Sequence, residues 1–244
     1  MQIFNDKKNK EFASYFQEIL DADAYYKEIK GLALKLKGNT VELINLNYKK
    51  EVSVLVDFSK ENNNFKDNNN FKKIFKRKGA SILDCTAGLG RDSFTLASNG
   101  FNVTMIEKNP IIVLLLKNGL QRFIGKTKNQ NKLSLLYGDS YDYLSLYNGR
   151  FDYIYIDFMF NKIKRKSLSS KNNETLKLLA DDKENRFRLL EIARKKCKFK
   201  VIVKGSRNLS SIPSLNPNYS IKTKLLRYDI FLGKDRLTID RQHG

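Results

Sequence analysis

A glycine turn lies between two carboxylates in the stretch from Ser81 to Glu107, which reads SILDCTAGLGRDSFTLASNGFNVTMIE. One predicted strand ends at Asp84, and the next predicted strand ends at Glu107. Between them, Gly88 and Gly90 form a Gly-x-Gly turn that leads into a predicted helix. Glycines let the backbone approach a ligand closely, and a helix N-terminus offers N–H groups without intrahelical partners. This unit therefore predicts a site for a nucleotide-like ligand.

The acids around the turn indicate which ligand is bound. Glu107 follows the first glycine by about 20 residues, where a carboxylate accepts hydrogen bonds from both ribose hydroxyls of a nucleoside. The glycines alone are a weak signal, because the third small position is Ser93. A dinucleotide is an alternative, but Asp84 before the turn and Arg91-Asp92 after it add negative charge where a pyrophosphate disfavours it. The cationic sulfonium of S-adenosylmethionine tolerates these acids, so we predict this cofactor; an ordinary strand-turn-helix without a ligand is the other alternative.

Two later strand ends carry further acids. Asp139 follows the predicted strand Leu133 to Tyr137. An acid there is placed to meet an adenine amino group or to cap the next helix, and the two roles are compatible. Asp157 ends the predicted strand Phe151 to Ile156, at the edge where open α/β sheets bind ligands.

Aromatic residues follow Asp157 directly, at Phe158 and Phe160. A carboxylate can accept an N–H of an exocyclic amine while a flat ring holds the base. These three residues are therefore the candidates for catalysis. Core packing is the alternative for both rings.

Positive charge is concentrated beside this predicted site. A basic loop follows the aromatic residues, at Lys162, Lys164, Arg165 and Lys166, and a basic amphipathic segment runs from Phe71 to Lys78. The whole chain has a formal net charge of +20, which favours an anionic partner such as RNA. Two alternatives stay open: the basic segment has a merely solvated lysine face, or the charge reflects an A/T-rich coding genome.

Several functional classes lack the residues that they need. The only histidine is His243, in a polar tail, which argues against a histidine triad and a histidine-bound metal. Cys85 and Cys197 have no metal-ligand spacing and are expected to be reduced core residues. No apolar run approaches the roughly 18 residues that span a bilayer, and the N-terminal residues lack a signal-peptide core. We therefore expect a cytoplasmic protein without a metal or a membrane partner.

The chain divides into a predicted N-terminal α+β cap at residues 1–60, a polar and basic linker at residues 61–80 and a main domain at residues 81–244. Apolar periodicity in the cap predicts one helix and three strands. The helix spans residues 10–20, and the strands are Leu32 to Leu36, Val41 to Leu46 and Val52 to Phe58, with a hairpin turn at Gly38-Asn39.

The main domain alternates strands and helices five times before a closing pair of strands. Its remaining predicted elements are a buried helix from Pro110, a helix from Glu184 to Lys195 with Phe187, Leu190 and Ile192 inward, and strands at Phe199 to Val203, Tyr219 to Lys224 and Arg227 to Leu232. This order predicts a Rossmann-like α/β domain with a mainly parallel seven-stranded sheet and a terminal antiparallel hairpin.

The segments ILDCTAGLGRDSFTLASNG, IEKNP, DYIYIDFMF, VIVKGS and RYDIF resemble the bacterial small-subunit ribosomal RNA guanine-N2 methyltransferases of the RsmJ family. The resemblance implies a class I methyltransferase fold and cofactor contacts at Arg91, Asp92, Glu107, Lys108, Asp139, Ser140 and Asp157. It implies as substrate one guanine near the 3′ end of 16S rRNA in the assembled small ribosomal subunit. The family's Asp-Pro-Met-Phe-Pro is Asp157-Phe158-Met159-Phe160-Asn161 here, so both prolines are replaced and the loop loses rigidity.

These observations predict methyl transfer from S-adenosylmethionine to the N2 amine of a guanine in rRNA. Asp157 would accept an N–H and Phe158 or Phe160 would stack on the base. Three alternatives stay open: a non-catalytic ribosome-binding factor that retains the cofactor fold, a methyltransferase for another nucleic-acid amine, and a nicotinamide-dependent reductase. The sequence leaves the oligomeric state open.

Overall fold

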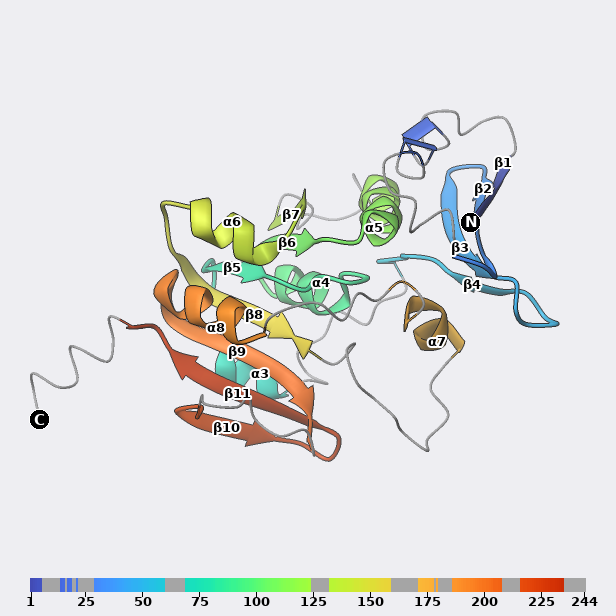
Figure 1. Ribbon diagram of the computed structural model, residues 1–244. Helices are drawn as coiled ribbons and strands as arrows, with labels where there is room; N and C mark the ends of the chain where they lie inside the picture. The colour runs from blue at the N-terminus through green and yellow to red at the C-terminus, as the bar shows by residue number, and fades with distance from the viewer. Residues whose placement is uncertain are drawn as a thin grey trace, which may run out of the picture. The chain divides into compact units, whose positions relative to one another are not determined.

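The computed structural model describes residues 1–5, 14–15, 17–18, 21, 29–59, 69–123, 132–158, 171–177, 179, 186–207 and 216–234. The chain forms two compact units (Figure 1). Unit 1 consists of Met1–Glu61, Asn109–Gln130 and Ile163–Ala180; unit 2 consists of Asn62–Lys108, Asn131–Lys162 and Asp181–Gly244. The predicted divisions at residues 60 and 80 are contiguous, whereas these units interleave along the sequence; the domain boundaries remain a prediction.

Unit 2 contains a seven-stranded sheet in the order β10-β11-β9-β8-β5-β6-β7. Its strands are β5 Ser81–Asp84, β6 Asn102–Glu107, β7 Leu133–Tyr137, β8 Phe151–Asp157, β9 Cys197–Ser206, β10 Tyr219–Lys222 and β11 Leu226–Leu232. Pairing is parallel from β9 to β7, whereas β11 runs antiparallel to both β9 and β10. The predicted sheet and its terminal hairpin are confirmed. Because β5 lies between β6 and β8, the strand order reverses there, and such a point opens a ligand crevice at the carboxyl edge.

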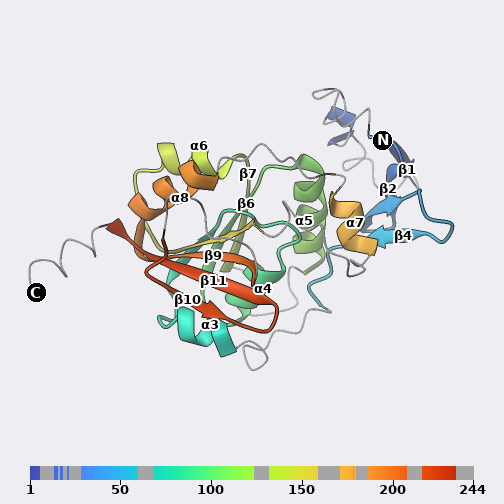
Figure 2. The same ribbon diagram turned by 60° about the horizontal axis from the view of Figure 1, so that its bottom comes forward.

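The alternation of β8 builds both faces of this sheet. Ile154 and Ile156 join a buried cluster with residues of α6 (Ser140–Leu146) and α8 (Arg186–Lys195). On the opposite face, Tyr153 and Tyr155 contact the segment of α3 (Asn69–Ile74), and Figure 2 shows α3 and the α6–α8 pair on opposite sides. The fourth helix, α4 (Arg91–Ser98), contacts β6. Tyr-Ile-Tyr-Ile is therefore a strand buried on both faces.

Two helix predictions in unit 2 require comment. The apolar side of the segment Phe71 to Lys78 lies in the core, since Phe71, Ile74 and Phe75 are all buried. The inward orientation predicted for Phe187 is wrong, because this ring is 44% exposed. The buried stripe of α8 instead runs through Leu189, Leu190 and Ala193, and Phe187 lies outside it.

Unit 1 is a four-stranded sheet with two helices. Its described elements are β1 Gln2–Asn5, β2 Leu32–Lys37, β3 Thr40–Asn45, β4 Val52–Val54, α5 Pro110–Phe123 and α7 Lys171–Lys177. The predicted hairpin is confirmed, with Gly38 at φ 58° between β2 and β3. β1 and α7 were not predicted, β4 is shorter than predicted, and most of the helix expected at residues 10–20 lies outside the described residues.

Polar and close contacts attach α5 to the unit 1 sheet. The Asn118 side chain accepts a hydrogen bond from the Val41 N–H (3.1 Å) and donates one to the Asn39 carbonyl (2.9 Å). One turn further, Gly119 lies against Val56. Within the described part of the chain, no helix has the length and apolar character needed to cross a membrane.

Gly119→Ala is expected to lower the free energy of unfolding by about 1 to 2 kcal/mol, despite the better helix propensity of alanine. A Cβ at this position would lie 2.4 Å from Val56 Cγ1 and 3.1 Å from the Val56 carbonyl oxygen, so backbone must move. Denaturant unfolding measures the change. The control is Gln121→Ala on the exposed side of α5, and equal stability of the two variants would contradict the close packing of Gly119.

Candidate active site

Four charged residues line the carboxyl edge of the unit 2 sheet. Neighbouring strands in the order β9, β8, β5 and β6 place there Lys204, Asp157, Asp84 and Glu107. Lys204 and Asp157 are direct register partners on β9 and β8. The topology thus brings together the three acids singled out in the sequence and adds a cation.

Lys204 bridges two carboxylates. Its Nζ lies 2.5 Å from Asp92 Oδ2 and 3.0 Å from Asp157 Oδ2. The three side chains are only 15%, 28% and 11% exposed, so solvent screens them weakly. Burial alone would lower the pKa of Lys204, but the attraction of Asp157 and Asp92 outweighs burial and raises that pKa above its ordinary value. The ammonium therefore stays charged and holds both acids.

Tyr155 completes this cluster from within β8. Its hydroxyl donates a hydrogen bond of 2.6 Å to the Asp92 oxygen that also meets Lys204. Burial, together with the nearby Asp92 and Asp157 carboxylates, raises the pKa of Tyr155 well above its ordinary value. The phenol thus remains a donor, and Asp92 is held from two strands.

Asp84 is a buried acid of a different kind. Its Oδ2 accepts a hydrogen bond from Ser93 Oγ (2.6 Å), and its Oδ1 accepts one from the Thr86 N–H (3.0 Å). Burial raises the pKa of Asp84 from its ordinary 3.8 to about 7, although both hydrogen bonds oppose this rise. The third small position of the turn is therefore a serine with a definite partner, since Ser93 is fully buried.

The glycine turn and Glu107 contact each other directly. Gly88 (φ 53°) and Gly90 (φ 74°) both adopt left-handed conformations that disfavour side chains. The Gly88 N–H donates to Glu107 Oε2 over 2.9 Å. Gly90 precedes the first turn of α4, which contains the exposed Arg91 and the half-buried Asp92. The predicted ribose acid thus also fixes the turn.

Asp139 is the N-cap of α6. Its Oδ1 accepts hydrogen bonds from the backbone N–H groups of Tyr141 (2.7 Å) and Asp142 (3.2 Å), which confirms the capping role. The neighbouring Ser140 hydroxyl donates to the Cys85 carbonyl over 2.7 Å. This contact ties the start of α6 to the turn after β5. The adenine contacts of Asp139 and Ser140, like a cofactor contact of the half-buried Lys108, remain predictions.

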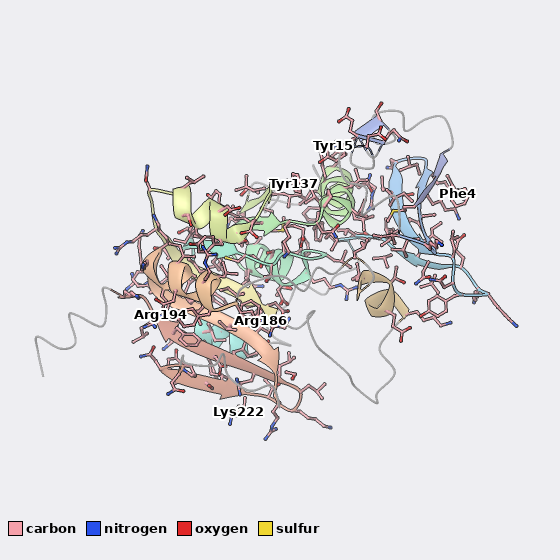
Figure 3. The ribbon with its side chains drawn as sticks, viewed as in Figure 1. Phe4, Tyr15, Tyr137, Arg186, Arg194 and Lys222 are labelled. Carbon is pink, nitrogen blue, oxygen red and sulfur yellow. The ribbon has the colours of Figure 1, made fainter. Side chains whose placement is uncertain are left out.

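The aromatic residues after Asp157 differ from their predicted roles. Phe158 is only 4% exposed and belongs to the core with Leu189 and Leu190, so its surroundings favour the core-packing alternative over base stacking. The Arg186 guanidinium lies 5.0 Å from its ring centre; Figure 3 labels Arg186 beside α8. Phe160 and the predicted basic loop Lys162 to Lys166 lie outside the described residues.

Sequence reasoning missed Lys204, Tyr155 and Thr86. Thr86 Oγ1 accepts a hydrogen bond of 2.6 Å from the Asp157 N–H, which fixes the backbone at the end of β8. A signal was present for Lys204, because it follows the apolar run Val201 to Val203 at the end of a predicted strand. A single lysine there has many uses, so its partners emerge only from the fold.

This site fits a nucleoside that carries a cation. Glu107 lies at the second strand end for a ribose, and the left-handed glycines allow close approach of the backbone. The acids Asp84, Asp92 and Asp157 are more numerous than the one buried lysine that they surround. This balance favours a positively charged group over a pyrophosphate.

Comparison with known proteins decides the assignment. Residues 20–233 match the family described as "Putative SAM-dependent methyltransferase". The chain belongs to this family. S-adenosylmethionine is therefore its cofactor, as predicted, and the nicotinamide-dependent alternative is set aside.

Relatives of this methyltransferase support the same assignment. Ribosomal RNA small subunit methyltransferase J from Buchnera aphidicola subsp. Schizaphis graminum is 34% identical over 218 residues, which cover 84% of this chain and 88% of the relative. The protein of that name from Coxiella burnetii is 39% identical over 155 residues, or 63% and 61% of the two chains. A SAM-dependent methyltransferase structure from Neisseria gonorrhoeae, 23% identical, covers 96% of both chains with a TM-score of 0.64 and shows the fold. The RsmJ resemblance and the class I fold are confirmed.

Asp84→Asn is expected to stabilise the protein at pH 8 and to change little at pH 4. The pKa of Asp84 rises on folding from 3.8 to about 7, so the folded state gains stability from this group below pH 3.8 and loses it as the pH rises through 7. At roughly 1.4 kcal/mol per unit, the loss reaches about 4 kcal/mol. Asparagine keeps the Thr86 contact and can donate to Ser93 without charge.

Denaturant unfolding of this methyltransferase at several pH values measures the effect. Asp142→Asn, an exposed acid on α6, is the control. A difference between wild type and Asp84→Asn that stays constant from pH 4 to pH 8 would show that Asp84 is ionised throughout.

Proposed function

We propose that this methyltransferase transfers a methyl group to the exocyclic N2 amine of a guanine in small-subunit ribosomal RNA. The observation that carries the proposal is the carboxylate of Asp157, held at the ligand edge by Lys204 and beside the nucleoside site of Gly88 and Glu107. Family membership supplies the cofactor, and the fold supplies a fixed acceptor next to it.

The amine of guanine requires orientation more than activation. Its lone pair is delocalised into the ring, and it is unprotonated at neutral pH. Asp157 accepts one N–H of the amine, which aims the nitrogen at the methyl carbon and stabilises the positive charge that develops on nitrogen. S-adenosylmethionine supplies the methyl group from a sulfonium when bound. The proton lost from the amine passes to Asp157 or to water.

The backbone around Asp157 supports this role. Its N–H is bonded to Thr86 Oγ1 and its carboxylate to Lys204, so both ends of the residue are fixed. The next ring, Phe158, is anchored in the core. A positioned acceptor loses little freedom when it meets its substrate.

An rRNA substrate is supported by the relatives and by charge. The relatives are named ribosomal RNA small subunit methyltransferases, and this chain carries a formal net charge of +20. A guanine within an RNA backbone requires both base recognition and phosphate contacts. Ribosomal RNA as substrate would place the reaction in the cytoplasm. Glu107, Arg91, Asp92, Lys108, Asp139 and Ser140 would hold the cofactor, as the family resemblance implies.

Asp157→Asn is expected to lower single-turnover methyl transfer by at least about 10²-fold, or roughly 2.7 kcal/mol. Asparagine keeps the size but loses the charge, and half of its head group becomes a donor that faces the hydrogens of the amine. Small ribosomal subunits that lack the modification, incubated with cofactor and digested to nucleosides, should yield N2-methylguanosine by mass spectrometry.

Two variants sharpen this experiment. Glu107→Ala should weaken cofactor binding by about 1.5 to 3 kcal/mol, whereas Asp142→Asn on exposed α6 should alter neither binding nor transfer. If Asp157→Asn retained transfer but lost cofactor affinity, Asp157 would be a cofactor ligand only. A methyl group on another amine, or none with wild-type protein, would refute the proposed reaction.

A further inference from the structure

α3 and the residues after it form a strongly basic surface in unit 2. All five cations between positions 72 and 78 are exposed: Lys72, Lys73, Lys76, Arg77 and Lys78. No acidic residue occurs from Asn69 to Ala80. The half-buried Lys200 of β9 adjoins them, with its Nζ 3.4 Å from the Ile74 carbonyl. We call these six residues the α3 basic face.

Aromatic packing fixes the orientation of this face. Phe71 contacts Tyr155 and Tyr228, with ring centres 6.0 and 5.9 Å apart. Phe75 contacts Tyr153 with ring centres 5.2 Å apart. Since these rings occupy the inner side of the segment, the lysines between them must project to solvent. Figures 1 and 2 both show α3 beside β10 and β11.

The cations of the α3 basic face are not neutralised. Among the described residues, Lys72, Lys73, Lys76 and Lys78 have no carboxylate partner within ion-pair distance. Lys198 on the same β9 strand differs, because its Nζ lies 3.2 Å from Asp152 Oδ1. Lysines clustered without acids repel one another and attract an anionic chain.

Flat groups accompany the charges. The Arg77 guanidinium lies 4.0 Å from the ring centre of Phe199, and Lys200 Nζ lies 5.8 Å from that of Tyr219. Tyr219 is 41% exposed, which leaves part of its ring available for a base. Cations interleaved with aromatic rings are typical of surfaces that bind single-stranded RNA. An acidic protein or a membrane would have no use for this pairing.

The α3 basic face begins next to the active site. Phe71 packs on Tyr155, whose hydroxyl bonds to Asp92 at the ligand edge. Phe75, one turn later, contacts Phe101 just before β6, at the opposite edge of the sheet. The segment therefore leads away from the site across one face of unit 2. An RNA with its target base at Asp157 could place neighbouring phosphates along this path.

We infer that the α3 basic face binds backbone phosphates of the RNA substrate and so positions the target nucleotide at the ligand edge. This inference rests on the proposed function for the identity of the RNA. Its contacts are independent of base sequence, because phosphates are the same at every nucleotide. Base recognition is left to the residues around Asp157.

The test compares two triple variants of the full-length protein with equal charge. The first is Lys72→Gln, Lys73→Gln and Lys76→Gln; the control is Lys49→Gln, Lys50→Gln and Lys195→Gln, three exposed lysines elsewhere. The probe is a single-stranded fragment of small-subunit rRNA, with binding measured over a range of salt. The slope of log affinity against log salt should fall by about 2 in the first variant, at roughly 0.7 per phosphate contact. The control slope should remain that of wild type, and a Lys→Arg triple at positions 72, 73 and 76 should restore it.

Two results would overturn the inference: an unchanged slope in the Gln triple at positions 72, 73 and 76, or an equal decrease in the control. Calorimetric binding of S-adenosylmethionine confirms that each variant is folded. Methylation is scored separately by mass spectrometry, with a higher KM for RNA expected in the first variant. If wild-type protein methylates the RNA but the slopes are equal, only this inference fails. If wild-type protein transfers no methyl group, the proposed function fails, while a slope that falls only in the first variant still supports the RNA surface.

Discussion

The ammonium of Lys204 is the interaction on which the site depends. Three separate elements deliver its partners: α4 supplies Asp92, β8 supplies Asp157, and β9 supplies the lysine. Without a cation, two carboxylates at the same sheet edge would repel each other and lose solvation. The lysine turns that conflict into a fixed geometry. Tyr155 and Thr86 then restrain the same acids from the strand and from the turn.

The loop after Asp157 shows how core packing can compensate for lost rigidity. Where the RsmJ pattern has proline, this chain has Phe158, which has greater backbone freedom. Its ring is nonetheless buried among α8 residues and lies under the Arg186 guanidinium. A side chain held in the core restrains the backbone that carries it. The start of the loop is thus anchored by burial instead of by a ring closed on the main chain.

Local sequence signals predicted the elements that carry the cofactor site, whereas long-range partners had to come from the structure. The pattern from Ser81 to Glu107 predicted both strands and the turn, because apolar runs, glycines and terminal acids act over a few residues. Lys204 was missed because its partners lie 112 positions away at Asp92 and across β8 at Asp157. Phe158 was first considered for base stacking, since an aromatic residue beside a catalytic acid has the same sequence appearance whether its ring is buried or exposed. β1 is short, and α7 has only one buried apolar side chain among those described, Leu176, so neither shows the periodicity on which prediction relies.

The measurement that tests the role of Lys204 most directly is the unfolding free energy of Lys204→Met as a function of pH. If the ammonium balances the two acids, the variant should lose about 3 to 5 kcal/mol at pH 8, the usual result of breaking a buried ion pair. Much of this loss should disappear by pH 4, where protonation relieves the repulsion between the carboxylates, and adding Asp92→Asn should restore part of it at pH 8. A loss that is the same at both pH values, and that Asp92→Asn does not reduce, would show that Lys204 contributes only the packing of its side chain.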